Sequence, residues 1–176
     1  MPREPLAALL AGGDRKSIGR SNEVVALVLS QRKRFPELVA CLWNDDPIVR
    51  MRAADAAEKA SAQCPALLEP FKPELLGLLV EAEQQELRWH LAQMIPRLPL
   101  TARERQRAAA NFRSFLKNRG SLVKTAGLQA LADLSRHDAE LRAEVMERIE
   151  DALQTGTPAM KARGRNLLRE FRSGSR

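Results

Sequence analysis

Apolar side chains recur along the chain with a helical spacing that repeats every 36 to 38 residues. Four basic residues mark the equivalent place in each repeat: Arg50, Arg88, Lys124 and Lys161. The positions −1, +3, +7 and +10 from each marker hold apolar or small side chains, and these offsets share one face of an α-helix. We therefore predict that each marker opens an amphipathic helix.

A second set of apolar columns precedes each marker, at offsets −12 and −8. These columns predict another amphipathic helix ahead of each marker helix, and Asp46-Pro47 and Thr157-Pro158 fit the joint between the two, since a capping residue before proline begins helices. The columns contain Leu38, Leu76, Phe112 and Ile149, and then Leu42, Val80, Leu116 and Leu153.

Four helix pairs follow from this register, at residues 35–63, 65–98, 101–136 and 138–172. Residues 1–34 form a predicted N-terminal cap with one or two helices, and residues 173–176 form a tail. A short helix pair cannot bury its apolar face alone, so neighbouring pairs are expected to stack around one continuous core. The expected fold is a single all-α domain over residues 1–176.

The segment 46–57, DPIVRMRAADAA, resembles the second helix of a HEAT repeat, with its Asp-Pro, Val-Arg and Ala-Ala elements. The other three repeats keep the apolar-then-basic pair and lose part of the rest. The resemblance covers residues 35–172 and implies a right-handed α-solenoid of antiparallel helix pairs. HEAT-repeat proteins are mostly binding scaffolds, so a scaffold role is also implied.

The composition narrows the fold class and the cellular compartment further. Aromatic residues make up 4% of the chain and tyrosine is absent, which disfavours β-sandwiches and barrels. Two cysteines, Cys41 and Cys64, argue against a disulfide-stapled secreted scaffold and favour a cytoplasmic protein in which both are reduced, small apolar side chains. No apolar run approaches the ~18–20 residues of a membrane span, so no membrane partner is expected.

No catalytic constellation stands out. His90 and His137 are far apart in the sequence and match no metal-binding spacing, and His90 is expected to be solvated or to cap its helix. Gly12-Gly13 lacks the residues of a phosphate-binding loop. We therefore expect a protein that is not an enzyme and has no cofactor and no metal.

The marker column supports two hypotheses. In the first, Arg50, Arg88, Lys124 and Lys161 form a basic ridge on the concave face of the solenoid, thickened by Arg52 and Arg163, that binds an acidic protein or peptide. In the second, each basic residue pairs with an acidic or amide group in the adjacent inter-repeat loop and ties the repeats together. The two are compatible, because a paired arginine keeps spare N–H donors.

The two tryptophans receive different predictions. Trp89 follows Arg88 and lies off the core columns, so it is expected to be exposed for stacking against a partner. Trp43 is expected to fill the core between repeats. The resulting set of partner-binding candidates is Arg50, Arg52, Arg88, Trp89, Lys124, Lys161 and Arg163.

The formal net charge of +7 keeps a nucleic-acid partner open as an alternative. Positive charge concentrates near the two ends of the sequence, and the C-terminal helix is the strongest basic segment, with a solvated outer face as its simpler interpretation. The HEAT resemblance also extends to alkylpurine DNA glycosylases, which use concave-face Trp, Asp and Arg side chains around DNA. The chain is short for that class, and no Asp aligns with a catalytic position.

Overall fold

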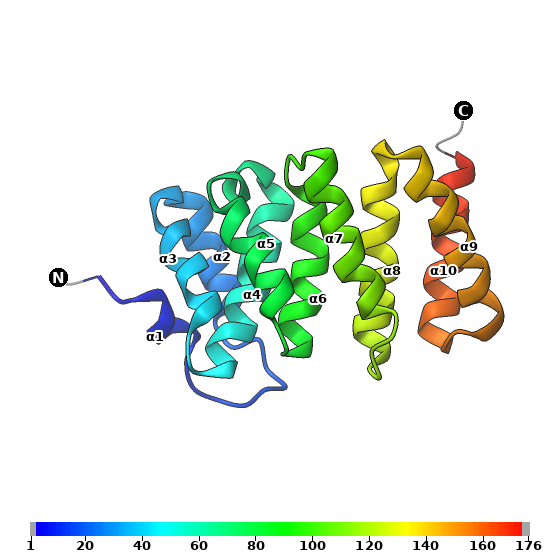
Figure 1. Ribbon diagram of the computed structural model, residues 1–176. Coiled ribbons are helices and arrows are strands. Elements are labelled where there is room, and N and C mark those ends of the chain that lie inside the picture. Colours follow the sequence, from blue (N-terminus) through cyan, green and yellow to red (C-terminus); the bar gives the residue numbers. More distant parts are fainter. Residues whose placement is uncertain (1–2, 174–176) are drawn as a thin grey trace. The chain divides into compact units, whose positions relative to one another are not determined.

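The computed structural model describes residues 3–173, and all regular structure in that range is helical (Figure 1). Short 3-10 segments extend or join several of the helices at residues 32–34, 41–43, 65–71, 95–97 and 135–137. The ten α-helices of the described range are α1 (Leu6–Leu10), α2 (Ser21–Ser30), α3 (Phe35–Ala40), α4 (Pro47–Gln63), α5 (Lys72–Glu81), α6 (Gln85–Met94), α7 (Ala102–Phe115), α8 (Ser121–Leu134), α9 (Ala139–Thr155) and α10 (Pro158–Ser173).

The chain divides into two compact units, Met1–Pro99 and Leu100–Arg176. The first unit contains α1 to α6, and the second contains α7 to α10. Neighbouring helices pack as pairs within each unit, which confirms the prediction of an all-α protein built from packed helix pairs.

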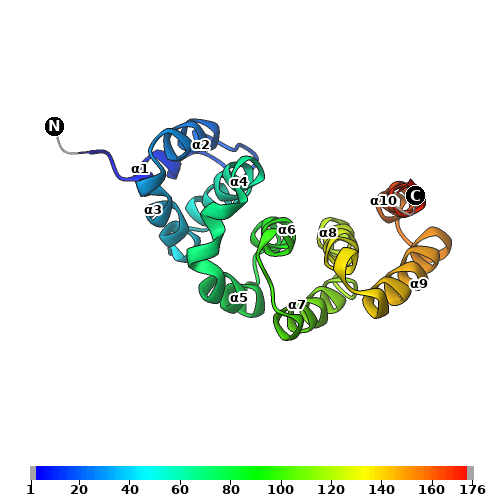
Figure 2. The same ribbon diagram turned by 90° about the horizontal axis from the view of Figure 1, so that it is seen from above.

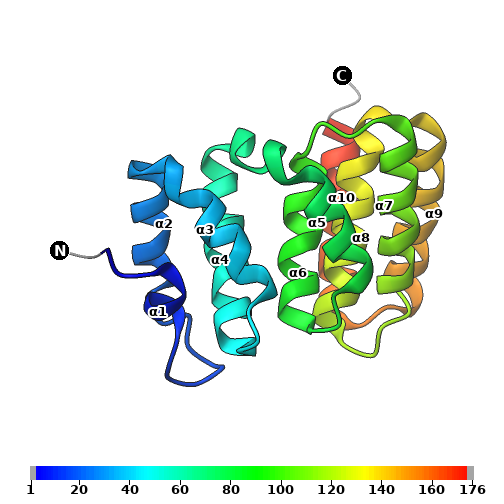
Figure 3. The same cartoon turned by 60° about the vertical axis from the view of Figure 1, so that its left-hand side comes forward.

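Helix α4 is the centre of the first unit and packs against α2 on one side and α6 on the other. Its small side chains allow this close packing, because Ala53, Ala54, Ala56, Ala57 and Ala60 are all fully buried. The loop between α1 and α2 descends beside the beginning of α4, as Figure 3 shows. The first unit therefore has its densest packing along one alanine-rich helix.

In the second unit, α7 packs on α8, α9 packs on α10, and α8 packs on α10. Figure 2 shows α7 and α9 in one row and α8 and α10 in the other. The α7–α8 contact requires Gly127, because a Cβ atom there would lie 2.8 Å from Cβ of Phe115 and 3.0 Å from the Phe112 carbonyl oxygen. The glycine in the +3 column thus allows two helices to approach closely.

The predicted columns of the marker helices hold in the structure. All their members are buried except Met160 and Leu168, which are half-buried at the last repeat. The −8 column of the preceding helices is wrong at Val80, which is 66% exposed. The buried column lies one residue earlier, three residues after the −12 column, and consists of Cys41, Leu79, Phe115 and Ala152.

The joints between paired helices carry the expected capping chemistry. Asp46 precedes Pro47, and its Oδ1 accepts a hydrogen bond of 2.8 Å from the Ile48 amide at the start of α4. At the start of α10, Thr157 Oγ1 accepts a bond of 3.3 Å from the Met160 amide. Among residues 3–173, no helix is long and apolar enough to cross a membrane.

Candidate functional site

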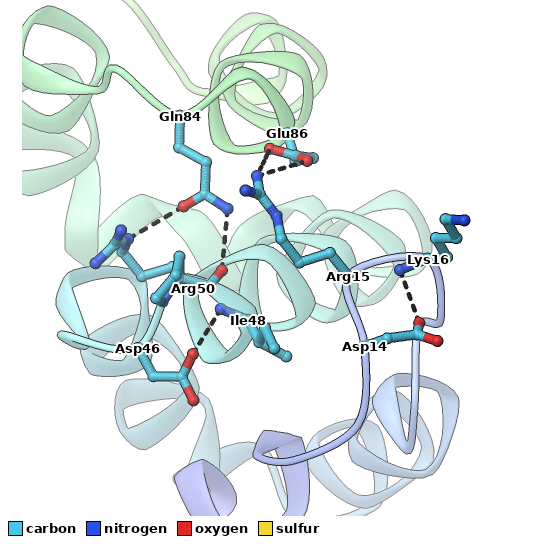
Figure 4. Close-up of polar contacts among 9 residues, drawn as sticks. Asp14, Arg15, Lys16, Asp46, Ile48, Arg50, Gln84 and Glu86 are labelled. Atoms are coloured by element: carbon cyan, nitrogen blue, oxygen red, sulfur yellow. Dashed lines mark hydrogen bonds and ion pairs between the residues drawn. The ribbon is translucent and has the colours of Figure 1, made fainter.

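Arg50 is tied to the loops at the beginnings of α4 and α6 (Figure 4). Its Nε donates to Oε1 of Gln84 at 3.2 Å, and its Nη1 donates to the Asn44 carbonyl at 2.6 Å. Gln84 in turn donates from Nε2 to the Pro47 carbonyl at 2.9 Å. Arg50 thus ties its repeat to an amide of the next repeat, as the second hypothesis expects, but Gln84 lies in the α5–α6 joint within that repeat and not in a loop between repeats.

Arg88 occupies the matching place on α6 and is half-buried. Its Nε donates to the Ala82 carbonyl at 2.6 Å, which again joins the marker residue to the loop before its own helix. Nearby, Arg15 from the α1–α2 loop forms an exposed ion pair with Glu86 at 3.1 Å (Figure 4). The beginning of α6 therefore combines an anchored arginine with an ion pair from a distant loop.

Arg52 does not belong to an accessible surface, which corrects the prediction that it thickens a basic ridge. Its side chain is 2% exposed, and its guanidinium donates to carbonyl oxygens of the α1–α2 loop. Distances are 2.8 Å to Leu10, 2.6 Å to Gly12, 3.1 Å to Asp14 and 3.1 Å to Ser17. A guanidinium presents five N–H donors in a planar fork, so one side chain can organise this whole loop.

The loop around Arg52 depends on glycine. Gly19 has a φ of +52°, and a Cβ atom there would lie 2.7 Å from Cζ of Arg52. Gly13 has a φ of +76°, and its Cβ would lie 3.2 Å from Nη2 of the same arginine. Backbone conformation and close approach thus both favour glycine at these two positions.

Trp89 is 37% exposed, in agreement with its position off the core columns. Its ring lies 4.5 Å from the ring of His90, centroid to centroid. Trp43 is 44% exposed, so the prediction that it fills the core between repeats is wrong. It stands at the end of a 3-10 turn, Cys41–Trp43, where Cys41 and Leu42 supply the buried face instead.

His90 is only 4% exposed, so the prediction of a solvated or capping histidine is wrong. Its Nδ1 is buried and has no hydrogen-bond partner among the described residues. Burial lowers the pKa of His90 below its ordinary value of 6.5, and the charges of Asp55 and Glu58 on α4 offset part of this effect. Burial of His90 against α4 therefore favours the neutral form of the imidazole.

In the second unit the marker residues are Lys124 and Lys161, both half-buried, with Arg163 two residues further on. Arg163 donates from Nη1 to Oε1 of Gln129 on α8 at 3.1 Å. Within residues 3–173, neither Lys124 nor Lys161 has a carboxylate within ion-pair distance. Arg50, by comparison, pairs with an amide oxygen and a backbone carbonyl and likewise has no carboxylate partner in the described part of the chain.

Two residues after the marker, three of the four repeats hold a polar or charged side chain, Arg52, His90 and Arg163, and the remaining repeat holds Ala126. Arg52 and Arg163 bond to the preceding loop or helix of their own unit, and His90 lies near charged groups of the preceding α4. A step of two residues turns a helix by about 200°, so this column faces away from the marker and toward the preceding element. The recurrence of polar side chains at this position, Arg52, His90 and Arg163, is the feature of the sequence that could have predicted these contacts.

Charge is divided unequally between the two units. The first contains 13 basic and 13 acidic side chains, and the second contains 16 basic and 9 acidic, so the second carries all of the net charge of +7. Among the described residues of the second unit, the ion pairs involve α7, α8, α9 and the segment 135–138 between α8 and α9, for example Arg113 with Glu144 at 2.6 Å. Apart from an Arg136–Glu170 contact of 3.7 Å, α10 takes no part in them.

The described residues include potential metal ligands and two cysteines. No group of three or more His, Cys, Asp or Glu side chains there could hold a metal ion. Cys41 is buried, burial raises the pKa of its thiol, and its Sγ donates to the Glu37 carbonyl oxygen at 3.3 Å. Both cysteines are free thiols.

Comparison with known proteins adds no family assignment. No protein-family model matches this chain, and no curated protein sequence matches it either.

Proposed function

We propose that this protein is a non-enzymatic binding scaffold of the HEAT-repeat type, in which helix pairs stack as a right-handed solenoid and an acidic protein or peptide binds along the beginnings of the marker helices. Support for the stacking comes from the α4–α6 and α8–α10 contacts within their units. The basic partner-binding residues are Arg50, Arg88, Lys124 and Lys161, whereas Arg163 bonds to Gln129 of α8 and lies on another face of its helix.

The main support for this proposal is the exposure of Trp89 next to Arg88. Tryptophan and arginine are among the side chains most often responsible for binding energy at protein interfaces. Trp89 is 37% exposed and directly follows the half-buried Arg88. Arg88 and Arg50 both keep their positive charge in their hydrogen bonds to neutral groups, so the surface offers an aromatic anchor next to positive charge.

The test measures tryptophan fluorescence and compares variants at Trp43 and Trp89. Because the chain has no tyrosine and only two tryptophans, the Trp43→Phe variant leaves Trp89 as the dominant emitter. Titration with a labelled oligoglutamate peptide should shift the emission of Trp89. Acidic proteins that co-purify with the full chain are titrated next and should give the same shift. Trp89→Ala should weaken binding about tenfold or more, as expected at an interface anchor.

Trp43→Ala is the matched control, since Trp43 is exposed in the same unit and belongs to the 3-10 turn Cys41–Trp43, not to a marker helix. It should leave the affinity unchanged. Equal losses in the two variants would reject Trp89 as the anchor. If Arg88→Gln and Lys124→Gln lowered the melting temperature without changing the affinity, the basic column would be structural only.

A further inference from the structure

Helix α10 carries a stripe of basic side chains along its whole length. Lys161, Arg165, Arg169 and Arg172 follow a spacing of i, i+4, i+8 and i+11, which places them on one helix face. Three of them are exposed and Lys161 is half-buried. We refer to these four residues as the α10 stripe, and it extends over about 16 Å of helix axis.

The stripe faces away from the core of its unit. The buried residues of α10 are Gly164, Leu167 and Phe171, which pack against α9 and α8. Arg163 lies on a different face and bonds to Gln129 of α8. The apolar contacts of α10 are therefore satisfied within the unit, and the stripe is left for solvent or a partner.

The positive charge of the stripe is not neutralised by the protein. None of its four residues has a carboxylate partner among residues 3–173, and the bond of Arg169 to Asn166 leaves its charge in place. Glu170 lies off the stripe and contacts Arg136 at 3.7 Å. On α7, by contrast, Arg105 and Arg113 each have a carboxylate on the neighbouring segment.

We propose that the α10 stripe binds the phosphodiester backbone of a nucleic acid. A phosphate backbone presents closely and regularly spaced negative charges, and basic side chains one helical turn apart are complementary to such an array. A protein partner is less well matched, because its binding energy usually comes from aromatic or apolar anchors. The stripe contains no such residue, and the phenylalanines of the second unit, Phe112, Phe115 and Phe171, are all buried.

This binding goes beyond the acidic-protein surface proposed above and does not depend on it. The two surfaces share Lys161, but the residues that test them differ: Trp89 belongs to the first unit, and Arg165 and Arg169 belong to the second. Either proposal can therefore fail while the other survives.

The experiment measures fluorescence anisotropy of a labelled DNA duplex with the full chain at about 50 and about 200 mM salt. Affinity should fall steeply with salt, and the double variant Arg165→Gln/Arg169→Gln should reduce the slope of log affinity against log salt by about 0.9 for each phosphate that the variant no longer neutralises. At low salt, the same variant should bind about tenfold more weakly or worse.

The matched control is Arg103→Gln/Arg107→Gln on α7. These two arginines are also exposed, are also four residues apart, and change the net charge of the second unit by the same amount. The control should bind DNA nearly as well as the natural sequence. Circular dichroism of both variants checks that they remain folded.

Three outcomes would overturn the proposal. An equal reduction of affinity in the α7 control would show that net charge acts without a site. Absence of binding at about 50 mM salt would exclude a phosphodiester partner. Stronger binding of the stripe to oligoglutamate or to anionic lipid vesicles than to the duplex, abolished in Arg165→Gln/Arg169→Gln, would assign the surface to an acidic protein or a membrane.

Discussion

At the scale of single residues, the least expected environment is that of His90. A basic side chain is usually solvated or paired, yet this imidazole is 4% exposed and its Nδ1 has no hydrogen-bond partner in the described part of the chain. Asp55, Glu58 and Lys59 on α4, with Glu86 on its own helix, are the charged groups that influence it. Protonation of His90 would place a poorly solvated cation where α6 packs against α4.

The pH dependence of stability follows from this environment. The pKa of His90 is lowered in the folded protein, whereas the unfolded chain takes up the proton near pH 6.5. As pH falls below about 6.5, the unfolded state binds a proton that the folded state does not, so the free energy of unfolding should decrease. Thermal melts between pH 7 and pH 5 should show this decrease.

Two variants isolate the effect. His90→Leu should flatten the dependence in this pH interval, because it replaces the titrating ring with an apolar side chain of similar burial. His137→Gln is the control, since His137 is exposed, and it should keep the pH dependence of the natural sequence. An unchanged profile in His90→Leu would show that other groups cause any decrease in stability.

At the scale of elements, the α1–α2 loop is organised by a side chain of α4. The loop has no regular structure between Ala11 and Arg20, and the guanidinium of Arg52 binds its carbonyl groups at several points. Buried charge-assisted hydrogen bonds of this kind are strong, and removing their donor leaves several carbonyl groups unsatisfied. Arg52 therefore acts as the centre around which the loop folds.

Arg52→Met should lower the free energy of unfolding by about 3 kcal/mol or more, since it removes the donors and keeps much of the side-chain volume. Hydrogen exchange of the amides in residues 11–20 should also become faster. Lys59→Met is the control: it removes a more exposed cation from the same helix, one that pairs with Asp55 at 2.8 Å. A smaller effect for Arg52→Met than for Lys59→Met would contradict this role.

At the scale of the whole molecule, the unequal charge of the two units is the main electrostatic feature. The second unit has 16 basic and 9 acidic side chains, so its own cations repel one another, whereas the first is balanced. This partition follows the boundary near residue 100, which cuts the sequence between two predicted repeats. Salt should therefore affect the two units differently.

Raising the ionic strength from about 20 to about 300 mM shortens the Debye length to a few ångströms and screens this repulsion. Hydrogen exchange in α8 and α10 should slow as a result, and exchange in α4 and α6 should change less. If salt changed the exchange rates more in the first unit, screening of the ion pairs in that unit would outweigh screening of the repulsion in the second. The measurement uses the full chain and compares peptides from each unit.

The helix pairs and their joints could be predicted from the sequence alone, because a helix is specified by local periodicity and capping. The −1, +3, +7 and +10 columns and the Asp46-Pro47 joint needed no knowledge of distant residues. The rotation of α5 that exposes Val80 could not be predicted in the same way. Leu75, Leu78 and Leu79 form a second, equally apolar face of α5, displaced by one residue from the predicted one. Neighbouring helices decide between two such faces.

The sequence by itself determined where the helices lie, which class of fold they form and which basic residues recur. Only the tertiary structure decided what each basic side chain does: Arg52 is buried in a loop, Arg50 is tied to Gln84, and the α10 stripe is left without carboxylate partners among the described residues. The physical reason is the range of the interactions. Helical periodicity acts over a few residues, whereas burial and pairing join groups that are more than 30 residues apart along the chain.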